Sequence, residues 1–125
     1  MIDFQDKHWL GFNGDDVVIT LDLGEIRTVH EVSIGFLQQQ GSWVFLPKRV
    51  QISVSIDGVD WKLLADLDNP IVQSERVLVR DFSFQVGGVR VKFIKTTATN
   101  IETCPTWHPG AGDKAWLFVD EATVR

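Results

Sequence analysis

The sequence is short of the residues that build several common kinds of site. Its 125 residues include no tyrosine and a single cysteine, Cys104. One cysteine cannot form an internal disulfide, and with His108 it would supply only two of the three or four ligands that zinc requires. No apolar run approaches the roughly 20 residues of a membrane-spanning helix, and Met1 begins no signal-peptide pattern. These absences exclude a disulfide scaffold and a membrane span, and they disfavour a zinc centre.

Positive charge is also scarce. The chain has 12 Lys and Arg against 17 Asp and Glu, a net charge of −5, and its basic residues are scattered. Nucleic-acid binding depends on clustered cations that displace counterions from the phosphate backbone, so we expect no nucleic-acid partner. Cys104 and His108 are close in sequence, but no third orienting group accompanies them, and no carboxylate pair stands in a glycosidase context. The sequence therefore predicts a domain without catalytic activity.

Alternating apolar and polar residues recur along the chain, as in half-buried strands. Gly24 is expected to close the first strong strand, and Gly87-Gly88 to open the penultimate one. Short strands joined by turn signals, without helical periodicity, predict one all-β domain over residues 1–125, a sandwich or a barrel. The segments 3–16 and 97–114 are not strand-like, and loops of such length are often functional. The predicted strands are 16–23, 31–37, 50–56, 62–65, 76–84, 89–93 and 115–124.

Three of the five tryptophans lie in polar loops, beside residues that donate and accept hydrogen bonds. An indole offers a flat face to the C–H face of a sugar, and flanking His and Gln side chains can bond its hydroxyls. Alternatively, these indoles plug the ends of the sandwich, with each N–H bonded to backbone. Trp61 and Trp116 are assigned to core packing. The predicted carbohydrate-binding residues are His8, Trp9, Gln38, Gln40, Trp43, Trp107 and His108.

Carboxylates gather near the two chain ends, where strand termini of a sandwich often meet. Oxygen ligands from loops suit calcium, whereas such residues are equally typical of solvated strand ends. The residues concerned are Asp3, Asp6, Asp15, Asp16, Asp120 and Glu121.

Several motifs, read together, resemble a known family. Residues 54–61, Val-Ser-Ile-Asp-Gly-Val-Asp-Trp, resemble the V-S-x-D-G-x-x-W/F hairpin of coagulation factor 5/8 type C, or discoidin-like, domains. Residues 19–24 are similar to the family's I-x-I-D-L-G strand, residues 89–91 to its R-V strand, and residues 119–124 to its closing strand. Three further stretches, 9–16, 35–47 and 104–112, resemble the C-terminal modules of bacterial family 20 β-hexosaminidases.

The resemblance implies a galactose-binding-domain-like jelly-roll β-sandwich related to carbohydrate-binding module family 32. It implies glycan binding at loops, an extracytoplasmic setting in a bacterium, and a structural calcium ion. The family's metal is held by a loop near the start and by an acidic residue of the last strand, which matches Glu121. The family's D-G-x motif precedes its first Trp, where this chain begins, so Asp3 and Asp6 are approximate matches.

The favoured hypothesis is a non-catalytic module of a larger glycoside hydrolase, similar to family 20 β-hexosaminidases, that binds galactosides or N-acetylhexosamines. The catalytic domain of the same chain is its second expected partner. The opening Met-Ile-Asp is read as the start of a segment excised from a larger chain, or as a start in mid-domain. The alternative is an accessory interaction domain whose Trp-rich loops pack on the catalytic domain without binding sugar.

Overall fold

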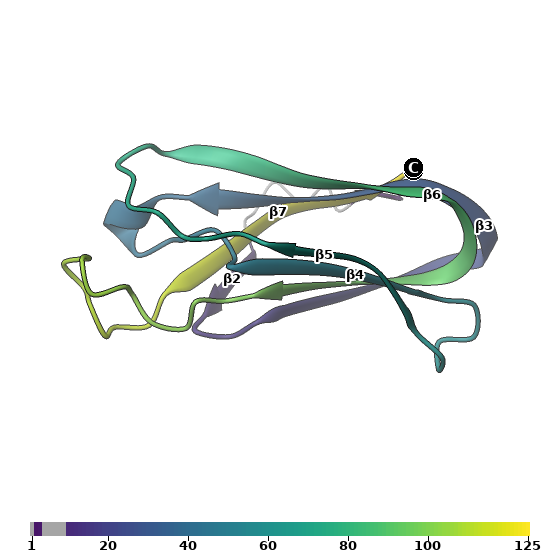
Figure 1. The fold of residues 1–125 in the computed structure, drawn as a ribbon, viewed down its shortest axis with the longest axis horizontal. Coiled ribbons are helices and arrows are strands. Elements are labelled where there is room, and N and C mark those ends of the chain that lie inside the picture. Colours follow the sequence, from purple (N-terminus) through teal and green to yellow (C-terminus); the bar gives the residue numbers. More distant parts are fainter. Residues whose placement is uncertain (1, 4–9) are drawn as a thin grey trace.

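The computed structural model describes residues 2–3 and 10–125, which form a β-sandwich (Figure 1). The described part of the chain contains one short 3₁₀ helix, Gln40–Ser42, and no helix in it is long and apolar enough to cross a membrane. The strands are β1 Ile2–Asp3, β2 Leu10–Asn13, β3 Val17–Gln38, β4 Arg49–Ser55, β5 Lys62–Asp68, β6 Leu78–Thr99 and β7 Trp116–Val124.

Two long strands, β3 and β6, run through both layers of the sandwich. They pair antiparallel from Val17 opposite Ala98 to Gln38 opposite Leu78, and both bend midway (Figure 1). The second half of β6 pairs with β4, which in turn pairs with β5, while the second half of β3 pairs with β7. The order of the single curled sheet is β1-β7-β3-β6-β4-β5, with β2 also paired to β7. The predicted all-β jelly-roll sandwich is confirmed.

Glycines mark the bends of the two long strands. Gly24 has φ 82°, and Gly87 and Gly88 have φ 76° and 77°. Without a Cβ, glycine adopts such angles at little cost, so a strand can turn sharply and resume its pairing. The register shifts between Asp22 and Arg27, and pairing continues beyond. The expectation that Gly24 ends a strand is therefore wrong, as is the separation of 76–84 from 89–93.

The core lies between the layers, in one cluster around Phe36 and Phe82 and another around Val32 and Ile94. Neither cluster contains Trp61 or Trp116, so their assignment to the core is wrong. Trp116 precedes the buried Leu117 on β7 and faces the opposite side, against Phe118. Trp61 lies half-buried under Lys95, whose Nζ is 4.0 Å from the ring centroid. Strand alternation places the Trp116 ring on the outer face of β7, whereas Trp61 lies in the connection before β5.

The sandwich has two distinct ends. At one, which we call the loop end, the connections 39–48, 69–77 and 100–115 lie together with the β2–β3 turn (Figure 1). At the other, the bend end, β3 and β6 curl over and both ends of the chain are held. Ile2 pairs with Val124, and the carbonyl of Arg125 accepts the backbone N–H groups of His30 and Glu31.

Candidate functional site

The two glutamines predicted to contact sugar fasten the loop end together. Both are buried, and the Gln40 amide bridges to the 69–77 connection: Nε2 donates to the Val72 carbonyl at 2.9 Å, and Oε1 accepts the Ser74 N–H at 2.9 Å. Gln38 Nε2 donates to the Arg76 carbonyl at 3.0 Å. The structure thus engages both amides within the chain, where they hold the loop in place.

His108 is the centre of the longest loop and is only 5% exposed. Its Nε2 lies 2.7 Å from the Gln40 carbonyl oxygen, and its Nδ1 lies 2.9 Å from the Gly110 N–H. Trp43 and Phe45 flank the ring edge-on, with centroids 4.8 and 5.3 Å away. The imidazole therefore joins the 104–113 loop to the turn at Gln40, and both its nitrogens are engaged there.

Trp43 packs against the same 104–113 loop. It caps the 3₁₀ helix in the left-handed conformation, at φ 64°, and its Nε1 donates to Asp113 Oδ2 at 3.3 Å. The backbone of Gly110 lies directly on the indole, since a Cβ built there would stand 2.0 Å from Nε1. Trp43 is therefore half-buried between Gly110 and Asp113. This position resembles the alternative prediction, in which the indoles plug the end of the sandwich.

Trp107 has the most exposed ring of the predicted tryptophans that the structure describes. It is 37% exposed and meets Phe45 edge-on at 6.2 Å between centroids. Because Phe45 is fully buried, the indole is anchored on the core, and 37% of the Trp107 surface is open to solvent. This arrangement can present a flat apolar surface to a ligand at little entropic cost.

The remaining predicted site residues lie at the edge of the described part of the chain or outside it. His8, Trp9 and Asp6 lie outside the described residues. For Asp3 and Glu121 only the backbone is described: Asp3 pairs with Thr123, two residues from Glu121 on β7. No cluster of three metal-ligating side chains occurs within the described part. Asp3, Asp6 and Glu121 as calcium ligands therefore stay a prediction.

Asn100 is a structural residue that the sequence pattern did not reveal. It is 1% exposed and follows the end of β6. Its Oδ1 accepts the Glu102 N–H at 2.8 Å, and its own N–H donates to Asp16 Oδ1 at 2.8 Å. The only sequence signal was an Asn after a strand, which is typical of any turn. Its Nδ2 contacts the carbonyls of Phe12, Asp15 and Ala115, at 3.3, 3.1 and 3.3 Å.

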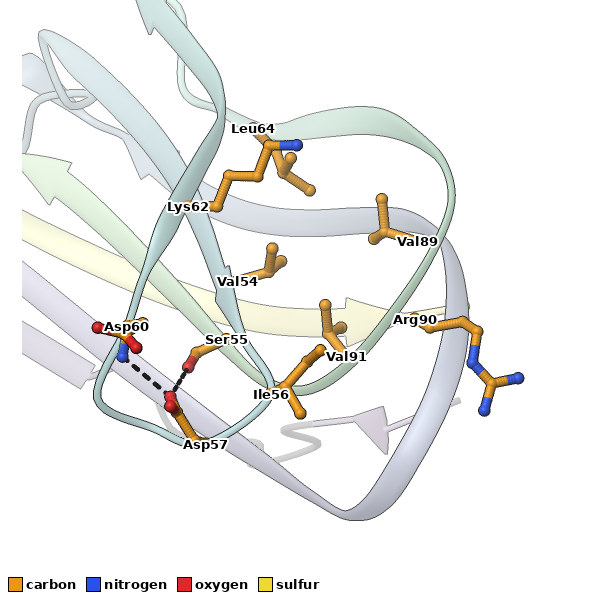
Figure 2. A pocket seen from close by; sticks show the side chains of 10 residues that line it. All are labelled: Val54, Ser55, Ile56, Asp57, Asp60, Lys62, Leu64, Val89, Arg90 and Val91. Carbon is orange, nitrogen blue, oxygen red and sulfur yellow. Dashed lines mark hydrogen bonds between the residues drawn. The ribbon is translucent and has the colours of Figure 1, made fainter.

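A groove of about 490 Å³ lies at the bend end, between the β4–β5 turn and the bend of β6 (Figure 2). Val54 and Val91 form a buried floor, and Ile56 is a wall 58% exposed to solvent. Aliphatic side chains thus surround the opening, and the ammonium of Lys62 lies at its edge in Figure 2. No residue of this groove had been predicted as a site. The complete lining is Val54, Ser55, Ile56, Asp57, Asp60, Lys62, Leu64, Val89, Arg90 and Val91.

Asp57 fixes one rim of this groove. Its Oδ1 accepts the N–H groups of Asp60 and Val59, each at 2.9 Å, and the hydroxyl of Ser55 at 3.0 Å. These hydrogen bonds, the one from Asp60 foremost, hold the pKa of the Asp57 carboxyl below its usual range. The Asp57 carboxylate therefore points into the β4–β5 turn and away from the groove (Figure 2).

Comparisons with known proteins agree with this geometry. A family model described as F5/8 type C domain matches residues 1–112. A family 32 carbohydrate-binding module of a family 89 glycoside hydrolase from Clostridium perfringens superposes with a TM-score of 0.58 at 13% identity, over 92% of this chain and 75% of that one. None of the curated protein sequences matches the chain.

Two further solved structures share the fold. A family 29 fucosidase of Ruminococcus gnavus, in complex with fucose, gives a TM-score of 0.64 at 18% identity, over 99% of this chain and 21% of that one. The C-terminal domain of a chitobiase from Bacteroides fragilis gives 0.53 at 17% identity, over 89% and 63%. This chain thus spans about a fifth of the fucosidase. The chain belongs to the F5/8 type C domain family.

Proposed function

We propose that this domain is a non-catalytic carbohydrate-binding module that holds a glycan against Trp107 at the loop end. Its parent would be a bacterial, extracytoplasmic glycoside hydrolase of the family 20 β-hexosaminidase kind, and its ligands galactosides or N-acetylhexosamines. The observation that carries the proposal is the exposed, anchored ring of Trp107. Gln38, Gln40 and His108 act in it by holding the loops, and Trp43 by supporting the 104–113 segment.

The position of the chain ends favours a free loop end. Both ends are held at the bend end, where Ile2 pairs with Val124. A catalytic domain joined to either end would lie beside the bend end, at the opposite end of the sandwich from the 100–115 connection (Figure 1). The loops that carry the tryptophans would then face outward, toward a soluble or surface-bound glycan.

Replacing Trp107 by alanine should weaken sugar binding at least tenfold, because the stacking surface is lost. We expect a Kd of about 0.1–1 mM for the unaltered domain, typical of a shallow site that must displace ordered water. Titration with galactose, N-acetylgalactosamine and N-acetylglucosamine, followed by amide resonances of 104–113, measures both. Trp61→Ala is the matched control, since Trp61 is a half-buried indole outside the loop end. No response to any sugar at about 10 mM, tenfold above that range, would refute the proposal.

A second function is favoured by the groove at the bend end. Its aliphatic floor and the exposed Ile56 form an apolar surface at the bend end, the end of the sandwich at which Ile2 pairs with Val124 and where a catalytic domain of the same chain would pack. Exposed apolar patches of this kind often mark interfaces. In this second function the interaction surface is the groove, whereas the sequence had suggested the Trp-rich loops.

Ile56→Asp should abolish association of the domain with the separately expressed catalytic domain of its parent protein. Sedimentation velocity of the mixture measures this association. Val18→Asp is the matched control, because Val18 on β3 is 59% exposed against 58% for Ile56. Equal association of both variants and the unaltered domain would show that the groove is not the interface.

A further inference from the structure

We infer that His108 is a positioning residue that holds the 104–113 loop, and with it the ring of Trp107, in its binding form only while its imidazole is neutral. The part of this inference that concerns ligand binding rests on the glycan function proposed above. It predicts that protonation of the ring makes the 104–113 loop rearrange and lowers the sugar affinity.

The hydrogen bonds around the ring require one neutral tautomer. The Gly110 N–H can only donate, so Nδ1, 2.9 Å away, must accept and carries no proton. The proton then resides on Nε2, which donates to the Gln40 carbonyl at 2.7 Å. Protonation would add an N–H at Nδ1 that points at the Gly110 N–H. A buried hydrogen bond would become a contact between two donors, and the Gly110 N–H would lose its partner.

The surroundings offer little to stabilise an imidazolium. The rings of Trp43, Phe45 and Trp107 enclose His108, and burial raises the pKa of the nearby Cys104 thiol, which keeps it uncharged. Asp113 bonds the Trp43 indole instead. No carboxylate among the described residues forms an ion pair with His108. The other charged side chains of the packed segments are exposed; these are Lys48, Glu102 and Lys114.

Loss of the neutral ring would reach the ligand surface through Gly110. The Gly110 backbone lies on the Trp43 indole, and Trp107 directly precedes His108. When the Gly110 N–H is repelled, the loop leaves Trp43 and carries Trp107 away from its position against Phe45. Protonation of His108 would thus displace the exposed ring of Trp107.

Imidazole nitrogen chemical shifts of the intact domain, measured between pH 8 and 5, test the tautomer directly. At pH 7.5 we expect a protonated Nε2 and an unprotonated Nδ1. The amides of 104–113 and the Trp43 indole N–H should then change together in a one-proton step as the pH falls. A protonated Nδ1 at pH 7.5, or loop signals that stay unchanged while the His108 ring itself takes up a proton, would overturn the inference.

A variant of His108 distinguishes the proposed pH response from a merely structural role of the ring. His108→Asn keeps an acceptor for the Gly110 N–H, as Asn does in Asx-turns, but it does not titrate. Its loop signals should therefore not change with pH, whereas His30→Gln, at an exposed histidine, should leave the wild-type response intact. In the wild type we expect the sugar Kd to be at least tenfold higher with the ring protonated than at pH 7.5. A loop that titrates without any sugar binding would refute the proposed function and uphold the inference.

Discussion

Replacing Asn100 by aspartate should lower the free energy of unfolding at pH 7 by about 3–5 kcal/mol, the usual cost of an uncompensated buried charge. The Asn100 side chain is 1% exposed and donates toward three backbone carbonyls. A carboxylate in its place would turn an acceptor toward those carbonyl oxygens. The β2–β3 turn, the end of β6 and the last long loop would lose their common anchor.

Urea denaturation followed by tryptophan fluorescence measures this loss. Burial among carbonyls would raise the pKa of the new carboxyl in the folded state above its unfolded value of about 3.9. The destabilisation should therefore be complete at neutral pH and shrink as the pH falls toward 4, since the protonated group can donate again. Asn13→Asp, at an exposed asparagine, is the control. A stability equal to that of the control at pH 7 would contradict the assigned role of Asn100.

Gly110→Ala should displace the 104–113 loop and remove at least nine-tenths of the sugar affinity. The added methyl would lie 2.0 Å from Trp43 Nε1 and 2.3 Å from Cε2, far inside contact distance. Either the indole or the loop must move, at a cost of about 1–3 kcal/mol for overpacking. Both movements disrupt the bond from Trp43 to Asp113 and the seat of His108.

The indole N–H resonance of Trp43 and a sugar titration report the two consequences separately. Gly41→Ala is the matched control, because Gly41 lies in the neighbouring connection and does not have a positive φ, and a methyl added there would meet no atom within 4 Å. It should keep the stability and the affinity of the unaltered domain. If Gly110→Ala behaves like Gly41→Ala, the packing of the loop on Trp43 is not what forms the binding surface.

The strands could be predicted from the sequence because alternation is a local property. Val50 to Val54 alternate in the sequence and do so in β4. Gly24 misled the prediction because glycine permits both a strand end and a bend, and only the distant partner strand β6 decides between them. Whether a tryptophan in an alternating strand faces the core or the outside, as at Trp116, likewise depends on which of its neighbours is buried.

Residue types drew attention to the loops at the loop end, but the sequence did not reveal which contacts their side chains make. The Trp-His pair at 107–108 drew attention to the long loop. However, the partner of His108 is the Gln40 carbonyl, 68 residues away in the sequence, and Asn100 meets carbonyls up to 88 residues away. Such contacts form only when the fold brings the loops to one end, so no local pattern could assign them. Residue type alone did not reveal that Gln38, Gln40 and His108 are buried and hydrogen-bonded within the chain.

The two layers of this sandwich share β3 and β6, each of which continues from one layer into the other. Neither layer can therefore detach while the other keeps its hydrogen bonds, and the domain has no internal seam along which it could open in part. The pairing of Val17 with Ala98 also joins residues that are far apart in the sequence, so the start of β3 meets its partner on β6 only when most of the chain is in place. We expect slow folding governed by distant contacts, and a core whose amides exchange with solvent as one cooperative unit.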